Sequence, residues 1–261
     1  GEMQMLNKIK SLLKSSSDVY ENEIMYHKNG KVMYEGSVKG SNFHGLGKYY
    51  DETGRLCYEG HFANGLPHGQ GKCYLEDGSI YEGELHKGER TGIGTKQFSD
   101  GSVYEGRFVD GAMEGKGKLT KPDGTIYEGN FLKNHLQGAG APASPNRVTY
   151  PNGDQYIGEF IDTIENGHGK LVISTGVYEG EVVNGLPHGK GHFIWNNDSS
   201  YYGDFLEGQM TGKGTITYAN GEKYIGDFKN GYKHGNGIYQ EASGTQYECY
   251  FEEDQLISAN R

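Results

Sequence analysis

The chain is short of the residues that build an ordinary globular interior. Only 34% of its 261 residues are hydrophobic and one is tryptophan, whereas 44 are glycine. No stretch approaches the roughly 20 apolar residues that a membrane-spanning helix needs. Glycine does not recur at every third position as in collagen, and the 21 tyrosines argue against a disordered chain. The composition therefore predicts an extended array rather than a domain with one compact core.

Positive charge and paired cysteines are also scarce. A formal net charge of -10 disfavours non-specific binding to nucleic acid, which needs lysine and arginine to displace counterions from phosphates. It also weakens attraction to an anionic membrane surface. The cysteines are Cys57, Cys73 and Cys249. Their spacing matches no metal or redox motif, and it favours a reducing, cytoplasmic compartment.

A motif of tyrosine, any residue and glycine recurs with a step of 23 residues in most copies. Its tyrosines are Tyr34, Tyr58, Tyr81, Tyr104, Tyr127, Tyr156, Tyr178, Tyr201 and Tyr224, and a degenerate copy follows at Tyr247. Nine residues after each motif glycine comes a Gly-x-Gly pair, which in the fifth copy is Gly138 and Gly140. Turn dipeptides such as Asp77-Gly78 separate that pair from the next tyrosine, and they are strong hairpin signals. A period of this length indicates a repeat architecture.

Each repeat predicts a β-hairpin with one aromatic face. If six residues form the hairpin loop after Tyr81, Gly83 faces Gly94. In the same register Leu85 faces Gly92. Because side chains alternate along a strand, the tyrosine and the apolar residue four positions later share a face with the glycines. Each ring can then cover a neighbouring glycine, the arrangement called aromatic rescue. The opposite face, with a glutamate after most of the tyrosines, is predicted to be charged and solvated.

The unit Tyr-Glu-Gly-x-Phe-x-x-Gly-x-x-His-Gly-x-Gly, nearly complete at residues 58–71 and 178–191, resembles the MORN repeat (membrane occupation and recognition nexus). The resemblance covers about residues 34–251. It implies an all-β fold, an elongated, twisted, single-layer antiparallel sheet of stacked β-hairpins. It also implies scaffolding at cytoskeletal and membrane junctions, binding of a partner helix along a groove, dimerisation and affinity for phosphoinositides.

We predict three segments along the chain: an amphipathic helix and linker over residues 1–22, a repeat array over 23–251, and a C-terminal tail over 252–261. The array has nine to ten repeats, begins with an incomplete hairpin near residues 19–26, and contains an insertion loop at 139–151. For this loop a tolerated insertion and a hinge or docking point both remain open. The short N-terminal helix is predicted from the spacing of Leu6, Ile9, Leu12, Leu13, Lys8, Lys10 and Lys14. This segment suits an end cap on the first hairpins, or binding to a membrane surface or a partner.

Motifs that suggest chemistry have simpler explanations. The Gly-x-Gly pairs lack the third glycine of a dinucleotide-binding loop. Histidines recur at His44, His68, His188 and His234. Equivalent positions in adjacent repeats lie roughly 9.6 Å apart, too far for one zinc ion to bind both. With no nucleophile, base and orienting acid outside the repeat pattern, we predict no enzymatic activity, no cofactor and no metal.

The sequence thus predicts a non-enzymatic, cytoplasmic protein-interaction scaffold at a cytoskeleton or membrane junction, which binds a helical or extended partner segment in an aromatic concave groove. The residues expected to line the groove are Phe108, Phe131, Phe160, Phe193, Trp195, Phe205, Tyr218, Phe228 and Tyr239. The alternative is a peripheral membrane tether that binds phosphoinositide headgroups through the amphipathic helix. A further hypothesis is a homodimer through the terminal repeats, because an open sheet edge offers an unpaired strand.

Overall fold

The computed structural model describes residues 21–141 and 144–261, and these contain strands and turns but no helix. The predicted N-terminal helix lies outside the described residues. The chain divides into two compact units, unit 1 up to Pro122 and unit 2 from Asp123 to Arg261. Each unit is described by itself below. None of the described residues forms a helix that could cross a membrane.

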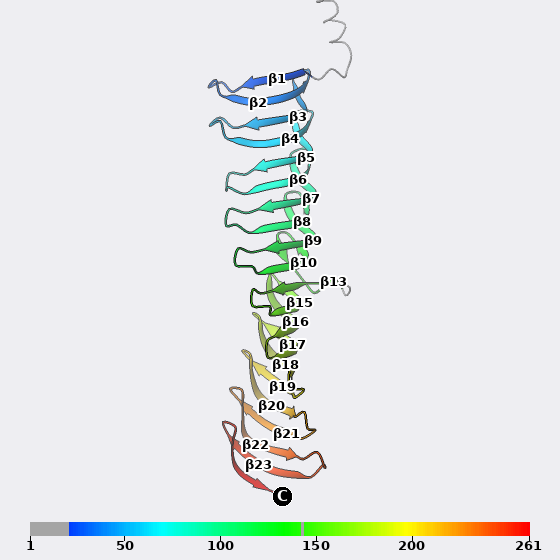
Figure 1. Ribbon diagram of the computed structural model, residues 1–261, viewed down its shortest axis with the longest axis vertical. Helices are drawn as coiled ribbons and strands as arrows, with labels where there is room; N and C mark the ends of the chain where they lie inside the picture. Colours follow the sequence, from blue (N-terminus) through cyan, green and yellow to red (C-terminus); the bar gives the residue numbers. More distant parts are fainter. Residues whose placement is uncertain (1–20, 142–143) are drawn as a thin grey trace, which may run out of the picture. The chain divides into compact units, whose positions relative to one another are not determined.

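Unit 1 is an antiparallel sheet whose strands follow one another in chain order (Figure 1). Its described strands are β1 (Glu21–Tyr26), β2 (Val32–Lys39), β3 (Asn42–Tyr50), β4 (Leu56–Ala63), β5 (Leu66–Tyr74), β6 (Ile80–His86), β7 (Glu89–Gln97), β8 (Val103–Val109) and β9 (Ala112–Thr120). Each strand pairs with the next. The pairing of β1 with β2 confirms the incomplete hairpin that was predicted before the first full repeat.

Unit 2 continues the same pattern after an irregular start. Its strands are β10 (Ile126–Leu132), β11 (His135–Leu136), β12 (Gly140–Ala141), β13 (Ser144–Pro145), β14 (Arg147–Thr149), β15 (Gln155–Ile161), β16 (Ile164–Ile173), β17 (Gly176–Val183), β18 (Leu186–Trp195), β19 (Ser200–Leu206), β20 (Gln209–Thr217), β21 (Lys223–Lys229), β22 (Tyr232–Gln240), β23 (Gln246–Glu252) and β24 (Gln255–Asn260). From β14 to β24 each strand pairs antiparallel with the next. The segment predicted as a C-terminal tail therefore supplies an edge strand, β24.

The hairpin of β6 and β7 tests the predicted register. Gly83 pairs with Gly94, as predicted. Leu85 pairs with Arg90, whereas the prediction placed it opposite Gly92. The prediction was therefore right in the middle of the hairpin and wrong near its turn.

The turn is the reason for that difference. It contains two residues, Lys87 and Gly88, with φ of 49° and 87°, which is the geometry of a tight type I′ turn. The extra residues of β7 form a bulge around Gly92, whose φ is 62°. Gly92 pairs instead with Phe108 of the next strand, so the bulge carries the chain from one hairpin to the next.

The core consists of tyrosine rings that lie on glycines, as aromatic rescue predicts. Tyr81 is fully buried. Its hydroxyl donates hydrogen bonds to the carbonyl oxygens of Glu84 (2.8 Å) and Thr91 (3.2 Å). A Cβ added at Gly94 would lie 2.6 Å from the Cε2 and Oη atoms of this ring. Burial raises the pKa of Tyr81 to about 12.

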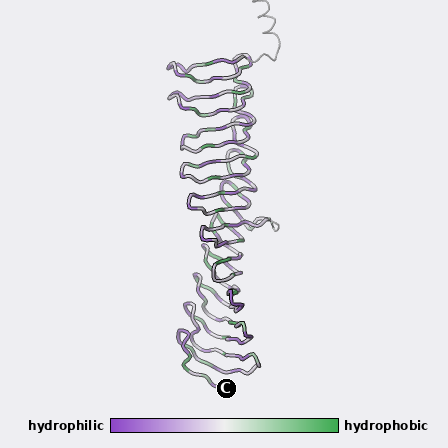
Figure 2. Tube along the Cα trace, viewed as in Figure 1, coloured by the Kyte–Doolittle hydropathy of each residue, from purple (hydrophilic) through white to green (hydrophobic). Residues whose placement is uncertain are grey.

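This contact recurs in both units. A hydroxyl bond to the carbonyl three residues later is made by Tyr34, Tyr58, Tyr81, Tyr104, Tyr156, Tyr178, Tyr201 and Tyr224. Phenylalanines join consecutive repeats, since the ring of Phe108 packs edge-on against Tyr104 (5.2 Å) and against Tyr81 (4.9 Å). Hydrophobic and hydrophilic residues are accordingly interspersed along the strands (Figure 2). The tyrosine, phenylalanine and glycine contacts within the sheet therefore form a core without a second layer.

The insertion alters the fifth repeat. The sequence predicted Gly138 and Gly140 as its glycine pair, but Gly140 lies in the separate ribbon of β12 and β13. Asn146 precedes β14, which pairs with β10, and so stands where the second glycine of a pair would be. The extra residues therefore fall inside the pair. The region predicted as an insertion loop at 139–151 contains this ribbon and the regular strand β14.

Asn146 is fully buried and its side-chain amide satisfies the displaced backbone. Its Oδ1 accepts a hydrogen bond from the backbone N–H of Asn130 (2.7 Å). Its Nδ2 donates to the carbonyl oxygens of Gln137 (2.7 Å) and Gly138 (2.9 Å). The amide side chain of Asn146 thus pairs backbone groups that backbone hydrogen bonds pair in the other repeats.

Candidate partner-binding surfaces

Each unit has two faces, which we name by what they carry. The ring face bears the repeat tyrosines, and the ladder face bears the residues directly after those tyrosines. Five predicted groove residues on the ring face are in the core: Phe108, Phe131 and Phe160 are 1% exposed, Phe228 4% and Phe205 5%. Phe205, for example, packs edge-on against Tyr201 (5.2 Å) and Tyr178 (5.0 Å). These five rings are covered by their neighbours, although Phe228 also lines a cavity; the other four predicted groove residues are more exposed.

Those four, Phe193, Trp195, Tyr218 and Tyr239, are half-buried and lie in unit 2. Trp195 and Tyr218 line a cavity of about 340 Å³ together with Phe228 and Lys233. Lys233 Nζ lies 3.5 Å from the Tyr218 hydroxyl and 4.6 Å from the ring centre of Phe251. Asp254 also lines the cavity, so one ammonium and one carboxylate group are present, and the aromatic walls suit an apolar or aromatic side chain.

Tyr239 is held in place rather than free. Its hydroxyl donates a hydrogen bond of 2.5 Å to Glu222. This bond, together with burial, raises the pKa of Tyr239 to about 12. The ring therefore offers its side and not its hydroxyl to any partner on this face.

The ladder face of unit 1 carries charges of alternating sign. One row across the strands reads Glu35, Lys48, Glu59, Lys72 and Glu82, each paired with the next. Lys48 Nζ lies 4.0 Å from a Glu35 carboxylate oxygen, and Lys72 Nζ lies 3.7 Å from Glu82. Exposed pairs of this kind contribute about 0.2–1 kcal/mol or less. The row is a solvated surface, as the sequence predicted.

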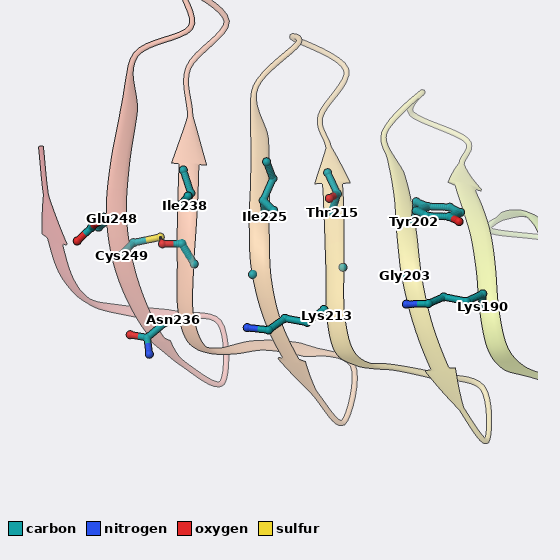
Figure 3. A pocket seen from close by; sticks show the side chains of 13 residues that line it. Lys190, Tyr202, Gly203, Lys213, Thr215, Ile225, Asn236, Ile238, Glu248 and Cys249 are labelled. Atoms are coloured by element: carbon teal, nitrogen blue, oxygen red, sulfur yellow. Dashed lines mark hydrogen bonds between the residues drawn. The ribbon is translucent and has the colours of Figure 1, made fainter.

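Part of the same row in unit 2, between His192 and Glu248, carries no charge and is mostly apolar. Tyr202, Thr215, Ile225 and Ile238 pair in this order on β19 to β22, and Figure 3 shows them in line across the strands. Tyr202 is 61% exposed, Ile225 41% and Ile238 37%. Ile194 of β18, 43% exposed, lies on the same face. These five residues form what we call the apolar patch.

A polar row borders the apolar patch. Lys190 Nζ lies 2.7 Å from Asp204, and Lys213 Nζ lies 2.5 Å from Asp227. In Figure 3 Lys190, Lys213 and Asn236 follow one another on this border. The two rows line a shallow hollow of about 640 Å³. An apolar centre with a polar rim is typical of a protein–protein interface.

The repeats identify the family of the chain. Eight segments match the model of the MORN repeat: residues 34–54, 58–80, 81–103, 104–126, 156–177, 178–200, 201–223 and 224–246. The chain belongs to the MORN repeat family. The matched segments leave out residues 127–155, where the insertion and Asn146 interrupt the repeat.

Some solved structures are similar to this MORN protein. The wild-type TCP10 domain of Danio rerio CPAP has a TM-score of 0.43 at 10% identity, covering 92% of this chain and 99% of that one. The complex of this domain with a peptide of Danio rerio STIL has a TM-score of 0.27 at 15% identity, and the match covers 75% of this chain and 96% of that one. The Drosophila melanogaster SAS-4 TCP domain in complex with a proline-rich motif of Ana2 has a TM-score of 0.29 at 11% identity, and the match covers 78% of this chain and 88% of that one. These likenesses are too distant to carry a conclusion for this chain. No curated protein matches the sequence.

The apolar patch is what sequence reasoning missed. It treated the ladder face as charged in every MORN repeat, because the residue after the tyrosine is glutamate in each of the first five copies. In later copies that position holds Tyr202 and Ile225. A comparison of this position between the individual repeats, rather than with the repeat consensus, would have found the patch.

The part of the chain that the structure describes shows no cluster of acidic, histidine or cysteine side chains that could hold a metal ion. The repeat tyrosines of the core already donate their hydroxyl hydrogens to backbone carbonyls, and the buried carboxylate of Glu165 accepts a hydrogen bond from Tyr150. The cavity at Trp195 and the apolar patch are the candidate contact surfaces of unit 2.

Proposed function

We propose that this MORN protein is a non-catalytic scaffold that binds a segment of a partner protein on the ladder face of unit 2. The observation that carries the proposal is the exposure of Tyr202, Ile225 and Ile238 at positions that hold charged residues in unit 1. Folding does not require these side chains, because they lie outside the core. Exposed apolar clusters with polar rims are typical of interaction sites, and tyrosine is enriched among the residues that dominate binding energy.

The row favours an amphipathic helix that lies across the strands. From β19 to β22 the row spans three strand spacings, about 14 Å. A helix rises 1.5 Å per residue, so apolar residues at i, i+3 or i+4, i+7 and i+10 or i+11 cover about the same length. The apolar stripe of such a helix would lie over Tyr202, Ile225 and Ile238. Polar residues beside the stripe would then meet the ion pairs of Lys190 with Asp204 and of Lys213 with Asp227.

Unit 1 supplies the control surface for a test. Its row Glu82, Thr95, Glu105 and Lys118 occupies the equivalent pairing on β6 to β9. The triple variant Tyr202→Glu, Ile225→Glu and Ile238→Lys, with Thr215 kept, gives unit 2 the same row. Because this row already folds within the same chain, the variant is expected to keep the fold.

The experiment is a quantitative pull-down from the native cell with wild type, the triple variant and a unit 1 control, Glu82→Gln with Glu105→Gln. We expect a partner that the control retains and the triple variant loses by at least roughly 30-fold, since a central interface residue often contributes 2 kcal/mol or more. Circular dichroism and a thermal melt confirm that the triple variant folds. If the folded triple variant retains every partner, the ladder face of unit 2 is not the binding surface.

The cavity at Trp195 is a second contact site for the same function, and of the predicted groove residues Trp195, Tyr218 and Phe228 line it. Trp195→Ala removes one wall of the cavity and leaves the apolar patch unchanged. If this variant and the triple variant both weaken the binding of a partner, that partner contacts both faces. A partner that Trp195→Ala leaves unchanged is held on the ladder face alone. We place the protein at a cytoskeleton or membrane junction, which imaging of the tagged full chain in its own cell tests.

A further inference from the structure

A second hollow on the ladder face lies at the start of unit 1. It covers about 910 Å³ over β1 to β4, and Ile24 and Leu46 are among its lining residues. These two aliphatic side chains are 56% and 61% exposed. They stand at the beginning of the charged row, beside Glu35 and Lys48. Ile24 therefore occupies a row position that Lys48 and Lys72 hold in the next two repeats, and Leu46 lies beside the row.

The lining of this hollow has an excess of negative charge. Two carboxylates, those of Glu35 and Glu59, and one ammonium group, that of Lys48, line it on the ladder face. Lys48 lies 4.0 Å from Glu35. Glu59 accepts a hydrogen bond from the Tyr74 hydroxyl (2.6 Å), which is neutral. An occupant with apolar side chains and positive charge would complement the site.

The chain carries such a segment directly before β1. Residues 3–14 combine Leu6, Ile9, Leu12 and Leu13 with Lys8, Lys10 and Lys14. Residues 15–20 connect this segment to Glu21, where β1 begins. Six residues reach up to about 20 Å when extended, and Asn22 and Ile24 of β1 already line the hollow. The connection is long enough for residues 3–14 to reach the hollow of their own chain.

We propose that residues 3–14 bind the ladder face of unit 1 in the same chain, with their leucines and isoleucine over Ile24 and Leu46 and their lysines towards Glu35 and Glu59. Docking there would cover exposed apolar surface at the end of a repeat array, where stacking leaves one unit without a neighbour. It would also keep the basic segment from acting as a membrane anchor. The proposal does not depend on the function of the apolar patch in unit 2.

Zero-length carbodiimide cross-linking of the full chain, followed by mass spectrometry, tests the contact. We expect cross-links between the lysines of residues 3–14 and Glu35 or Glu59. Mixing light and heavy isotope-labelled protein separates the outcomes, because links within one chain join only equal labels. Absence of these links, or links that join only different copies, would overturn the proposal.

Charge reversal gives the matched variants. Glu35→Lys with Glu59→Lys is expected to abolish the cross-links, and Glu82→Lys with Glu105→Lys, farther along the same row, is expected to leave them unchanged. An equal loss of cross-links in both double variants would contradict the proposed location. Hydrogen exchange of residues 3–14 should quicken in Leu46→Glu, and unchanged exchange there would also count against it.

Vesicles that contain a phosphoinositide test the alternative, in which residues 3–14 bind a membrane. If residues 3–14 are docked, Leu46→Glu should increase co-sedimentation of the protein with these vesicles. If wild type and variant sediment equally and no intrachain cross-link forms, the segment serves as a tether and the proposal fails.

Discussion

The contact between Tyr81 and Gly94 allows the stability of the sheet to be tested at one atom. Gly94→Ala adds a methyl group 2.6 Å from two atoms of the Tyr81 ring, closer than real Cβ atoms come to a neighbour. Gly94 does not have a positive φ, so the substitution causes no backbone strain of that kind. The cost must come from the ring, which has to move or tilt.

The size of the effect follows from what the ring loses. Overpacking a filled site costs about 1–3 kcal/mol. A displaced ring also weakens its hydroxyl bonds to Glu84 and Thr91, each of which contributes about 0.5–1.5 kcal/mol. We expect a local destabilisation of about 2–4 kcal/mol, which corresponds to about 30-fold to 1,000-fold faster amide exchange in β6 and β7.

Hydrogen exchange followed by mass spectrometry is the suitable assay, because a repeat array need not unfold in one step. Thr95→Ala is the matched control, since Thr95 is the next residue and is exposed on the ladder face. Its effect should stay within about 0.5 kcal/mol. The decisive comparison is a double-mutant cycle. In a Tyr81→Ala background, Gly94→Ala should cost nothing, and an equal cost in both backgrounds would refute the contact as the reason for the glycine.

Three further predictions concern the core, the insertion and the edge. Burial raises the pKa of Tyr81 and Tyr178 to about 12 from 10.0, so their contribution to stability is complete below pH 10 and disappears as the pH rises to about 12. Residue-resolved NMR of the Tyr81 and Tyr178 rings should show ionisation only together with unfolding, and ionisation of these two rings near pH 10 in a folded protein would contradict this. Asn146→Ala should cost about 2–3 kcal/mol in a urea titration, because it leaves buried backbone groups unpaired. Light scattering should show a dimer through β24, whose residues Leu256 and Ile257 are each 56% exposed, and Leu256→Lys should make it a monomer; a dimer that persists excludes this edge.

Much of the fold could be predicted from the sequence because one motif is repeated. Nine copies of tyrosine and glycine, most of them 23 residues apart, specify the strand faces and the middle of each hairpin. The turn was harder to predict. Asp77-Gly78 forms a turn between repeats as predicted, but the predicted six-residue hairpin loop is a two-residue turn at Lys87-Gly88 with two positive φ angles. The exposure of a side chain depends on neighbouring strands, and so the sequence could not show that Phe108 is covered by tyrosines of two repeats while Trp195 is not.

The insertion shows a different reason for a wrong prediction. Gly138 and Gly140 have the expected spacing, but that spacing arises by coincidence inside the inserted segment. The backbone pairing places Asn146 in the second position instead, where its side-chain amide makes the bonds that keep the register. Only the pairing of β14 with β10 distinguishes the two assignments.

Site-specific photo-cross-linking in the native cell tests the functional claim most directly. A photoreactive residue at the position of Ile225 in the apolar patch is compared with one at the equivalent position of unit 1, that of Glu105. The account predicts a partner cross-link from Ile225 and none from Glu105. Equal cross-linking from both positions, or capture only from Trp195 on the ring face, would contradict it.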